Sequence, residues 1–319
     1  MKRCSRRITL FIVWIALLGA FVLPLSARAA SPAQIRAQVP GYYRMMLGEF
    51  EVVALYDGFN RIGLNVLQGI DEKEARARLA RYFLETDSGV QTAVNAYLIH
   101  TGSHLVLIDA GTGSCFGPTL GGVADNIRAA GYTPEQIDIV LLTHLHGDHV
   151  CGLSRGNERV FPNATVLVAA DEADYWLNPR MTGDGFRMAQ AALAPYIAAE
   201  RLKRYATDEP LVPGIRVIPT PGHTPGHASF LIGGNGPQLL IWGDIVHSHA
   251  IQFADPTVSM AFDTDPARAV ETRQRVFAET AKKSWLVGGA HLPFPGIGHV
   301  ADGHDGYRWI PVEYAPVAQ

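Results

Sequence analysis

The sequence predicts a layered α/β fold, and two observations lead to this prediction. Short apolar runs bounded by turn residues alternate with longer segments of helical periodicity along the chain after residue 29. No low-complexity linker and no short repeat interrupts this alternation, so we expect residues 30–319 to form a single domain. The composition is that of a globular protein, because 48% of the 319 residues are hydrophobic and 18% are charged.

The expected strands are short apolar segments between turn residues. Asp57-Gly58 is expected to end the first strand, and the Thr-Gly-Ser turn at residues 101–103 separates the second from the third. The segment from Ile137 to Thr143 is too short for a helix, which favours a buried strand. The expected strands cover Glu49–Tyr56, Ala93–Ile99, Leu105–Asp109, Ile137–Thr143, Thr165–Ala169, Ile215–Pro219, Ala228–Ile232, Leu239–Trp242 and Trp285–Val287.

The expected helices lie between these strands. The segment from Asp71 to Phe83 has alternating charges with Ala and Leu at helical spacing, which indicates a surface helix. Gly131 is placed to end the helix expected at Leu120–Ala130. Further helices are expected at Asp171–Leu177, Phe186–Arg204 and Pro266–Glu279.

The first 29 residues have the composition of an export signal. A basic start at residues 2–7 precedes an apolar run from Ile8 to Leu25, and Ala27-Arg28-Ala29 places small residues at both positions that a signal peptidase reads. Ser5-Arg6-Arg7 partly resembles the twin-arginine signal, although Thr9 stands where that signal usually has Phe. We expect residues 1–29 to be cleaved and the mature protein to be periplasmic or secreted. An uncleaved membrane anchor is the alternative.

The charge of the expected mature chain argues against a nucleic-acid partner. All charged residues before Ala30 are basic, so 22 basic and 30 acidic side chains remain after cleavage, a formal charge of −8. A nucleic-acid-binding protein should show a basic stripe, and the sequence shows none. We therefore expect no function on RNA or DNA.

Two cysteines, Cys115 and Cys151, remain after cleavage because Cys4 leaves with the signal. Two thiols in an oxidising compartment could pair as a disulfide, but we expect two buried free thiols. Two cysteines are too few for a cysteine-based zinc site, so a metal would have to be held by other side chains.

A dense group of potential metal ligands follows one of the expected strands. The sequence there reads His144-Leu145-His146-Gly147-Asp148-His149. In an extended segment His144 and His146 point to the same side, so both imidazoles can bind one ion. Gly147 permits the turn at which Asp148 and His149 emerge. Such side chains would be costly to pack together without partners, and a metal supplies the partner. A solvated polar loop is the alternative.

Three further candidates lie in loops that follow expected strands. His223 lies in a Pro-Gly-His-Thr-Pro-Gly-His segment, Asp244 lies in a Gly-Asp pair after a buried strand, and His291 ends a Gly-Gly-Ala-His segment. Each one alone is a weak signal, because a lone histidine after a strand is usually a surface residue. Their order after the first motif strengthens all three together.

Taken together, these motifs resemble those of the metallo-β-lactamase superfamily. The shared pattern is His-x-His-x-Asp-His, then Gly-His-Thr-Pro-Gly-His, Gly-Asp and a final histidine. The resemblance implies an αββα sandwich with two divalent metal ions at one edge of its two sheets. It implies that His144, His146 and His223 hold the first metal, that Asp148, His149 and His291 hold the second, and that Asp244 bridges both.

The resemblance also implies the supporting chemistry of the site. Asp109, in an Ile-Asp-Ala-Gly segment, matches a position that orients a histidine ligand. Histidine and carboxylate ligands without thiolates suit Zn²⁺ as the default for a His-rich hydrolase, and also Mn, Co or Fe. The redox branch of the superfamily has Glu where this chain has His146, which argues against redox chemistry.

Segments outside the metal motifs resemble one branch of the superfamily, that of methyl parathion hydrolase and related lactonases. These segments cover residues 41–48, 116–121, 172–176, 211–215, 291–299 and 306–308. The branch implies an apolar, aromatic pocket, in which Phe116 and Trp176 match aromatic positions. Phe186 is a third candidate, although the stretch before it is shorter than the family pattern. His247 stands where methyl parathion hydrolase has an apolar pocket residue, which favours lactones and aryl esters over phosphotriesters.

The activity implied by this resemblance is hydrolysis by a hydroxide shared between two metals, with Asp148 and Asp244 as the catalytic carboxylates. We expect small neutral lactones and aryl esters as substrates, with organophosphate triesters as the alternative main activity. A β-lactamase is less favoured, because β-lactamases lack the bridging carboxylate that Asp244 supplies. A thioester hydrolase of the glyoxalase II type and a metal-binding protein without catalysis are also less favoured. The resemblance further suggests a homodimer.

Overall fold

The computed structural model describes residues 31–206, 211–304 and 306–317. Residues Pro40–Gln319 form one compact unit, and the described residues 31–39 lie outside it. The expected signal at residues 1–29 lies outside the described residues, so export stays a prediction. Among the residues that are described, no helix has the length and hydrophobicity needed to cross a membrane.

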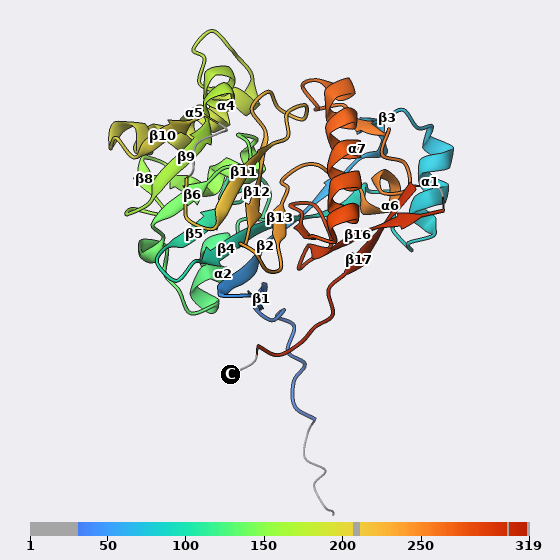
Figure 1. The fold of residues 1–319 in the computed structure, drawn as a ribbon, viewed down its shortest axis with the longest axis horizontal. Helices are drawn as coiled ribbons and strands as arrows, with labels where there is room; N and C mark the ends of the chain where they lie inside the picture. The colour runs from blue at the N-terminus through green and yellow to red at the C-terminus, as the bar shows by residue number, and fades with distance from the viewer. Residues whose placement is uncertain (1–30, 207–210, 305, 318–319) are drawn as a thin grey trace, which may run out of the picture. The chain divides into compact units, whose positions relative to one another are not determined.

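A seven-stranded mixed sheet forms one half of the compact unit (Figure 1). Its strand order is β1-β2-β4-β5-β6-β9-β10. The strands β1, β2, β4 and β5 are antiparallel in sequence order, whereas β5, β6, β9 and β10 run parallel to one another. The bounds are β1 Tyr42–Leu47, β2 Phe50–Ile62, β4 Val90–His100, β5 Leu105–Ile108, β6 Ile139–Leu141, β9 Thr165–Ala169 and β10 Leu202–Tyr205.

A six-stranded sheet forms the other half, with the order β11-β12-β13-β15-β16-β17. All neighbours are antiparallel except β13 and β15, which are parallel, so the loops that leave these two strands start at the same edge of the sheet. The bounds are β11 Ile215–Pro219, β12 Ala228–Ile232, β13 Leu239–Ile241, β15 Leu286–Gly288, β16 Ile297–Gly303 and β17 Gly306–Pro311.

The main core lies between the two sheets. Successive side chains of a strand face opposite sides, so Val52 and Ala54 of β2 pack against Phe230 and Ile241 of the second sheet, whereas Leu55 belongs to the core on the other face of its own sheet. All five side chains are buried. Full burial of a side chain such as Val52 or Leu55 stabilises the fold by about 1.5–3 kcal/mol. A slip of β2 by one residue would exchange the side chains that face the two cores, so their burial fixes the register of the strand.

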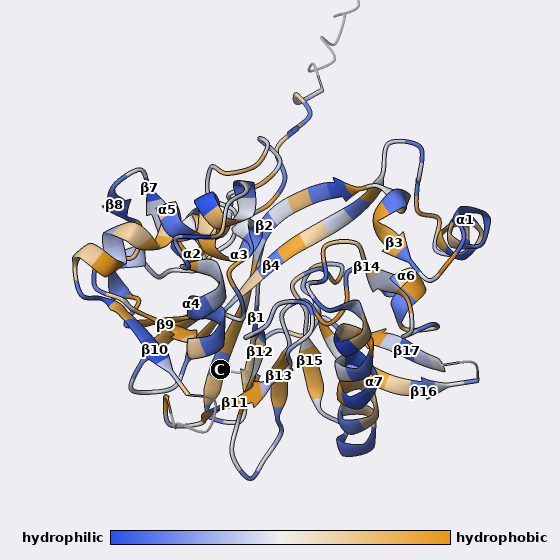
Figure 2. Ribbon diagram, turned by 90° about the horizontal axis from the view of Figure 1, so that it is seen from above, coloured by the Kyte–Doolittle hydropathy of each residue, from blue (hydrophilic) through white to orange (hydrophobic). Residues whose placement is uncertain are grey.

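Helices cover the outer face of each sheet and complete four layers. Buried side chains of α2 (Val123–Ala129) and α5 (Asp184–Ala198) belong to the core outside the first sheet. Side chains of α7 (Pro266–Lys283) pack on Trp242 and Leu240 outside the second sheet. In Figure 2 the strands β11, β13 and β15 carry mostly apolar colours, whereas α7 and α1 (Glu72–Ala80) carry mostly polar ones. The predicted αββα architecture is therefore confirmed.

Short elements surround the end of the sandwich at which the predicted ligand residues lie. They are α3 (Gly147–Val150), α4 (Ala170–Trp176), α6 (His249–Gln252), and two small ribbons, β3 (Leu67–Gln68) with β14 (Ser259–Met260) and β7 (Ser154–Arg155) with β8 (Glu158–Arg159). None of the small ribbons was predicted, because two-residue strands leave no periodic signal.

The expected end of the first strand at Asp57-Gly58 is wrong. Strand β2 continues to Ile62, and a register shift between Tyr56 and Gly58 accommodates these residues as a bulge. The buried Asp57 carboxylate accepts hydrogen bonds from the backbone and hydroxyl of Thr112 and from the backbone of Gly121. A polar residue that usually marks a turn is satisfied here by a distant loop.

The expected helix at Phe186–Arg204 is too long. Helix α5 ends at Ala198, the backbone turns through Glu200 with a φ of 55°, and residues Leu202–Tyr205 become β10. Strand β10 pairs in parallel with β9 at the edge of the sheet. The strands β1, β16 and β17 were also missed. The remaining predicted elements are present, with the predicted bounds for β9, β11 and β12 and with bounds shifted by a few residues for the others.

The expectation of free thiols is also wrong, because Cys115 and Cys151 form a disulfide with their Cα atoms 6.1 Å apart. Cys115 lies in an exposed loop, and Cys151 directly follows α3. The two cysteines are 36 positions apart in the sequence, and the segment between them carries no local signal of this contact. Only the packing of the loop against α3 brings the two sulfur atoms together.

Candidate metal centre

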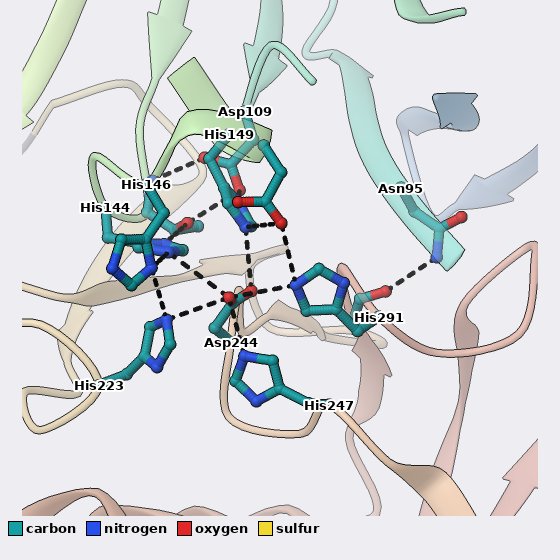
Figure 3. Close-up of polar contacts among 12 residues, drawn as sticks. Asn95, Asp109, His144, His146, His149, His223, Asp244, His247 and His291 are labelled. Atoms are coloured by element: carbon teal, nitrogen blue, oxygen red, sulfur yellow. Dashed lines mark hydrogen bonds and ion pairs between the residues drawn. The ribbon is translucent and has the colours of Figure 1, made fainter. Parts of the chain in front are cut away.

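The predicted ligand residues converge at one end of the two sheets (Figure 3). They come from the loops after β6, β11, β13 and β15. The backbone of Trp242 donates to the carbonyl of Gly288, which holds the loops after β13 and β15 side by side. The residues brought together are His144, His146, Asp148, His149, His223, Asp244 and His291.

One group of potential ligand atoms belongs to His144, His146, His223 and Asp244, and these atoms all lie within 4.8 Å of one another. Nδ1 of His146 lies 3.1 Å from Nε2 of His144 and 2.9 Å from Nε2 of His223. Nε2 of His223 also lies 3.2 Å from Oδ2 of Asp244. Three imidazoles and a carboxylate therefore face one point.

A second group of potential ligand atoms belongs to Asp148, His149 and His291, and these atoms also lie within 4.8 Å of one another. Nε2 of His149 lies 3.2 Å from Oδ1 of Asp244, and Nε2 of His291 lies 3.2 Å from Oδ2 of Asp244. Asp148 Oδ2 lies 3.6 Å from Nε2 of His149 and 3.5 Å from Nε2 of His291. The Asp244 carboxylate thus lies between the two groups.

The polar atoms of these residues are arranged so that divalent metal ions would satisfy them. Nε2 of His149 and Oδ1 of Asp244 are buried 3.2 Å apart, and neither makes a hydrogen bond to any of the residues that the structure describes. A buried polar atom without a partner costs about 1–3 kcal/mol. Ring nitrogens that face one another at 2.9–3.1 Å also need a common acceptor of their lone pairs. Imidazole and carboxylate donors together suit zinc and other divalent transition metals.

The electrostatics of the group agree with this fit for His144, His146 and Asp244. Burial lowers the pKa of His144 well below its usual value and that of His146 to about 3, so both rings are neutral near pH 7. Burial opposes ionisation of Asp244, but the neighbouring His149 and His291 hold its pKa well below its usual value. Neutral imidazoles and an ionised carboxylate are the forms that coordinate a metal. Against the effect of burial, the nearby carboxylates raise the pKa of His149 and His291 and raise that of His223 to about 9, so these three rings would release a proton when a metal binds.

Asp109 lies where the sequence analysis placed it, next to a histidine of the group. Its Oδ2 lies 2.8 Å from Nδ1 of His149. The backbone and hydroxyl of Thr143 donate to the two oxygens of Asp109, each at 2.8 Å. The carboxylate therefore holds the His149 ring with Nε2 directed at Asp244.

Three other supporting residues were missed by the sequence analysis. Glu172 of α4 accepts from the backbone of Leu145 and Gly226, each at 2.9 Å, and so connects the first two ligand loops. Nε2 of His227 accepts from the backbone of Asp244 at 3.1 Å. Oδ1 of Asp263 lies 2.6 Å from Nδ1 of His223. His227 could have been identified from the sequence, because it is the second histidine of the Gly-His-Thr-Pro-Gly-His motif. No metal-ligand motif contains Glu172 or Asp263.

A cavity of about 310 Å³ opens beside the cluster. Phe116 and His247 line it together with Asp148, Asp244 and His291, and a role of Phe116 and His247 toward a substrate stays a prediction. Its other walls are mainly apolar and include Ile62, Val94, Leu120, Met188 and Phe262.

Trp176 and Phe186 are not among the residues that line this cavity. Their rings pack together with centroids 4.6 Å apart, and Trp176 meets the His146 ring edge-on at 5.1 Å. This aromatic pair packs against the predicted ligand His146, and its role in a substrate pocket stays a prediction.

His247 points into the protein and not to solvent. Its side chain is buried at 4% exposure, and its ring stacks on His291 with centroids 4.9 Å apart. Nδ1 of His247 is buried without a hydrogen-bond partner. Asp244, His247 and His291 form a third group of possible ligand atoms within 4.8 Å.

Known proteins are similar to this chain in sequence. A model of the Metallo-beta-lactamase superfamily matches residues 89–291, a range that contains all the predicted ligands. N-acyl homoserine lactonase AttM of Agrobacterium fabrum is 30% identical over 201 residues, which are 61% of this chain and 68% of that protein.

Two solved structures agree with this match. The hydrolase AbOPH, of the beta lactamase superfamily, superposes with a TM-score of 0.84 and 42% identity over 88% of this chain and 100% of that chain. AidC, a dizinc quorum-quenching lactonase in complex with a product, gives a TM-score of 0.80 and 26% identity over 86% and 99% of the two chains. The relatives thus include lactonases, and the two solved structures share the fold along nearly their whole length.

Proposed function

The chain belongs to the Metallo-beta-lactamase superfamily of metal-dependent hydrolases, and from this premise we propose that it hydrolyses lactones and aryl esters with two divalent metal ions. The observation that carries the proposal is the position of the Asp244 carboxylate between two separate groups of ligand atoms. Its Oδ2 lies 3.2 Å from Nε2 of both His223 and His291, and its Oδ1 lies 3.2 Å from Nε2 of His149. A single-metal site would need only one of these groups. AttM and AidC, both lactonases, support the choice of lactones.

In this proposal His144, His146 and His223 hold one metal, Asp148, His149 and His291 hold the other, and Asp244 contacts both. Bound divalent ions supply Lewis acidity, which polarises an ester carbonyl and lowers the pKa of water toward neutrality. Zinc is the proposed metal, because the donors are imidazoles and carboxylates and AidC is a dizinc enzyme. Manganese, cobalt and iron are the alternatives.

The protein contributes orientation and proton handling. Asp109 and Glu172 fix the loops that carry His149 and His146, so that the ligand atoms are in place before a substrate binds. The Asp148 side chain is 26% exposed and lines the cavity. Its carboxylate can accept a proton from the attacking water and return it to a departing alkoxide. A phenolate leaves without this help, which is why aryl esters are included.

The cavity favours a small neutral substrate. Its lining residues include apolar side chains from β2, β4 and α5 and neither lysine nor arginine. An anionic substrate would find no cation in this wall apart from the metals, whereas an ester or lactone with an apolar limb buries that limb against Phe116 and Met188.

Phosphotriester hydrolysis as the main activity is the alternative, because the same centre can attack phosphorus. His247 counts against it. An imidazole in the wall prefers a hydrogen-bonding partner, which a lactone or ester oxygen provides and an alkoxy carbon does not. β-Lactam and thioester hydrolysis remain less favoured.

We also propose that the protein is exported. The basic and apolar start of the sequence supports this. The disulfide between Cys115 and Cys151 supports it independently, because disulfides persist mainly in oxidising compartments. A homodimer is proposed from the resemblance alone.

The test is a panel of γ- and δ-lactones, aryl acetates, dimethyl and diethyl phosphotriesters and a β-lactam, ranked by kcat/KM. Each substrate is assayed with the metal-loaded protein, after chelation, and after zinc is restored. We expect lactones or aryl acetates to rank first and chelation to abolish their turnover. A phosphotriester or β-lactam in first place would reject the proposed substrate class, and turnover that survives complete metal removal would reject the mechanism.

A further inference from the structure

We infer that Asp263 is a positioning residue for the metal centre, because its carboxylate fixes the ring orientation and tautomer of His223. The inference rests on the proposed function, since it assigns a task toward a metal that His223 would hold. Asp263 lies 40 residues from His223 in the sequence, in the turn that follows β14. It belongs to none of the motifs that identify the ligands.

The contact between the two side chains is short and buried. Oδ1 of Asp263 lies 2.6 Å from Nδ1 of His223, and both residues are buried. With the proton on Nδ1 and donated to this carboxylate, Nε2 carries the free lone pair. That Nε2 lies 2.9 Å from Nδ1 of His146 and 3.2 Å from Oδ2 of Asp244, directed at the other ligand atoms.

The second oxygen of Asp263 holds the carboxylate in place. Oδ2 accepts from the backbone of Met260 at 2.8 Å, and the backbone of Asp263 donates to the Met260 carbonyl at 3.0 Å. The backbone of Thr264 also donates to the carbonyl of His223 at 2.9 Å. The turn and the His223 loop are thus joined by their backbones as well as by the side-chain contact.

The same turn carries part of the substrate wall. Phe262 is 38% exposed and lines the cavity, with its ring centroid 5.8 Å from that of His223 and 5.0 Å from that of His247. The adjacent backbone of Ala261 donates to the carbonyl of Val66, beside the β3–β14 ribbon. The turn after β14 therefore positions both Phe262 in the cavity wall and the ring of the predicted ligand His223.

Asparagine at position 263 separates this role from simple filling of space. The carboxylate offers one oxygen to each of two donors, Nδ1–H of His223 and N–H of Met260. An asparagine of the same shape has only one acceptor oxygen. If its amide nitrogen faces His223, the ring is driven to the tautomer with a proton on Nε2, which removes the lone pair from the metal. If the nitrogen faces Met260, two donors oppose each other.

The experiment compares Asp263→Asn with Asp265→Asn. Asp265 is exposed, and its side chain accepts from the backbone of Arg268 at the start of α7, a position where Asn serves as well as Asp. Zinc affinity is measured by chelator competition, and the visible spectrum of the cobalt-loaded protein reports ligand geometry. We expect the affinity for one of the two metals to fall about 10–100-fold in Asp263→Asn, with an altered cobalt spectrum. The Asp265→Asn variant should match the wild type in both.

Two further measurements make the test decisive. Circular dichroism and the unfolding transition of the metal-free protein show whether each variant is folded. If Asp263→Asn does not fold, Asp263→Glu retains the charge and both acceptor oxygens, and it should bind zinc more weakly than the wild type. Unchanged zinc affinity and an unchanged cobalt spectrum in the folded variant overturn the role of Asp263. A wild-type protein that binds no metal overturns the proposed function as well.

Discussion

Nε2 of His247 lies 3.1 Å from Oδ2 of Asp244, and the His247 ring stacks on that of His291. The imidazole that the sequence analysis placed in a substrate wall is therefore also in contact with the carboxylate between the two ligand groups. Its second nitrogen is buried without a partner. A substitution at His247 must change both the wall and the hydrogen bonding of Asp244.

Replacing His247 by Leu is expected to raise phosphotriester turnover relative to lactone turnover. The leucine removes the imidazole that prefers a polar partner and leaves an apolar wall for alkoxy groups. The measurement is the ratio of kcat/KM for a dimethyl phosphotriester to that for a γ-lactone, and we expect it to rise severalfold. His249→Leu is the matched control, because His249 does not line this cavity. An unchanged ratio, or a wild type that already prefers the phosphotriester, would contradict the argument.

Metal analysis tests the centre directly. Elemental analysis of the fully active protein should find two divalent metals per chain, and a structure of the loaded protein should place them about 3.5–4 Å apart. Asp244→Asn should lower the occupancy of both positions, because Asp244 faces both ligand groups. One metal or none per active chain would remove the two-metal proposal.

Glu172→Gln should loosen the ligand loops without touching a ligand. The carboxylate accepts from the backbone of Leu145 and Gly226, whereas a glutamine has a single acceptor oxygen for these two donors. Loss of one buried hydrogen bond should lower the free energy of unfolding by about 1–3 kcal/mol. Denaturant unfolding of the metal-free protein measures this, with the exposed Glu200→Gln as the control. Equal stability of the wild type and Glu172→Gln would show that the contact is not needed.

The disulfide predicts the outcome of a thiol count. Thiol titration of the mature protein, unfolded without reductant, should find no free thiol, because Cys115 and Cys151 are paired. The double variant Cys115→Ser/Cys151→Ser should lose about 2–4 kcal/mol of stability, since the closed loop restricts the unfolded chain. A count of two thiols would mean that the bond does not form in the natural compartment.

Export predicts where the mature chain begins. N-terminal sequencing of the protein from its natural compartment should start near Ala30, after the small residues that a signal peptidase reads. Replacing Arg6 and Arg7 by Lys should block export if the twin-arginine route is used and leave it unchanged if another route is used. A membrane-bound product that begins with Met1 would identify the apolar run as an anchor.

The sequence alone identified candidate ligands most clearly where these residues lie close together in the chain. His144, His146, Asp148 and His149 lie within one turn after a strand, and their spacing alone marked them as candidate ligands. Strands such as Thr165–Ala169 and Ile215–Pro219 were predicted with their observed bounds, because their apolar runs end at clear turn residues. The order of the later candidates allowed the family and its αββα fold to be predicted.

Only the tertiary structure decided what supports these ligands and what lies beside them. Asp263 reaches His223, Glu172 reaches Leu145, and Cys115 reaches Cys151 across 40, 27 and 36 residues of sequence. Periodicity reports which face of an element is buried, but the partner of a carboxylate or a thiol depends on how distant loops pack. For the same reason Asp57 was read as a turn residue, although a distant loop satisfies its carboxylate inside a continuing strand.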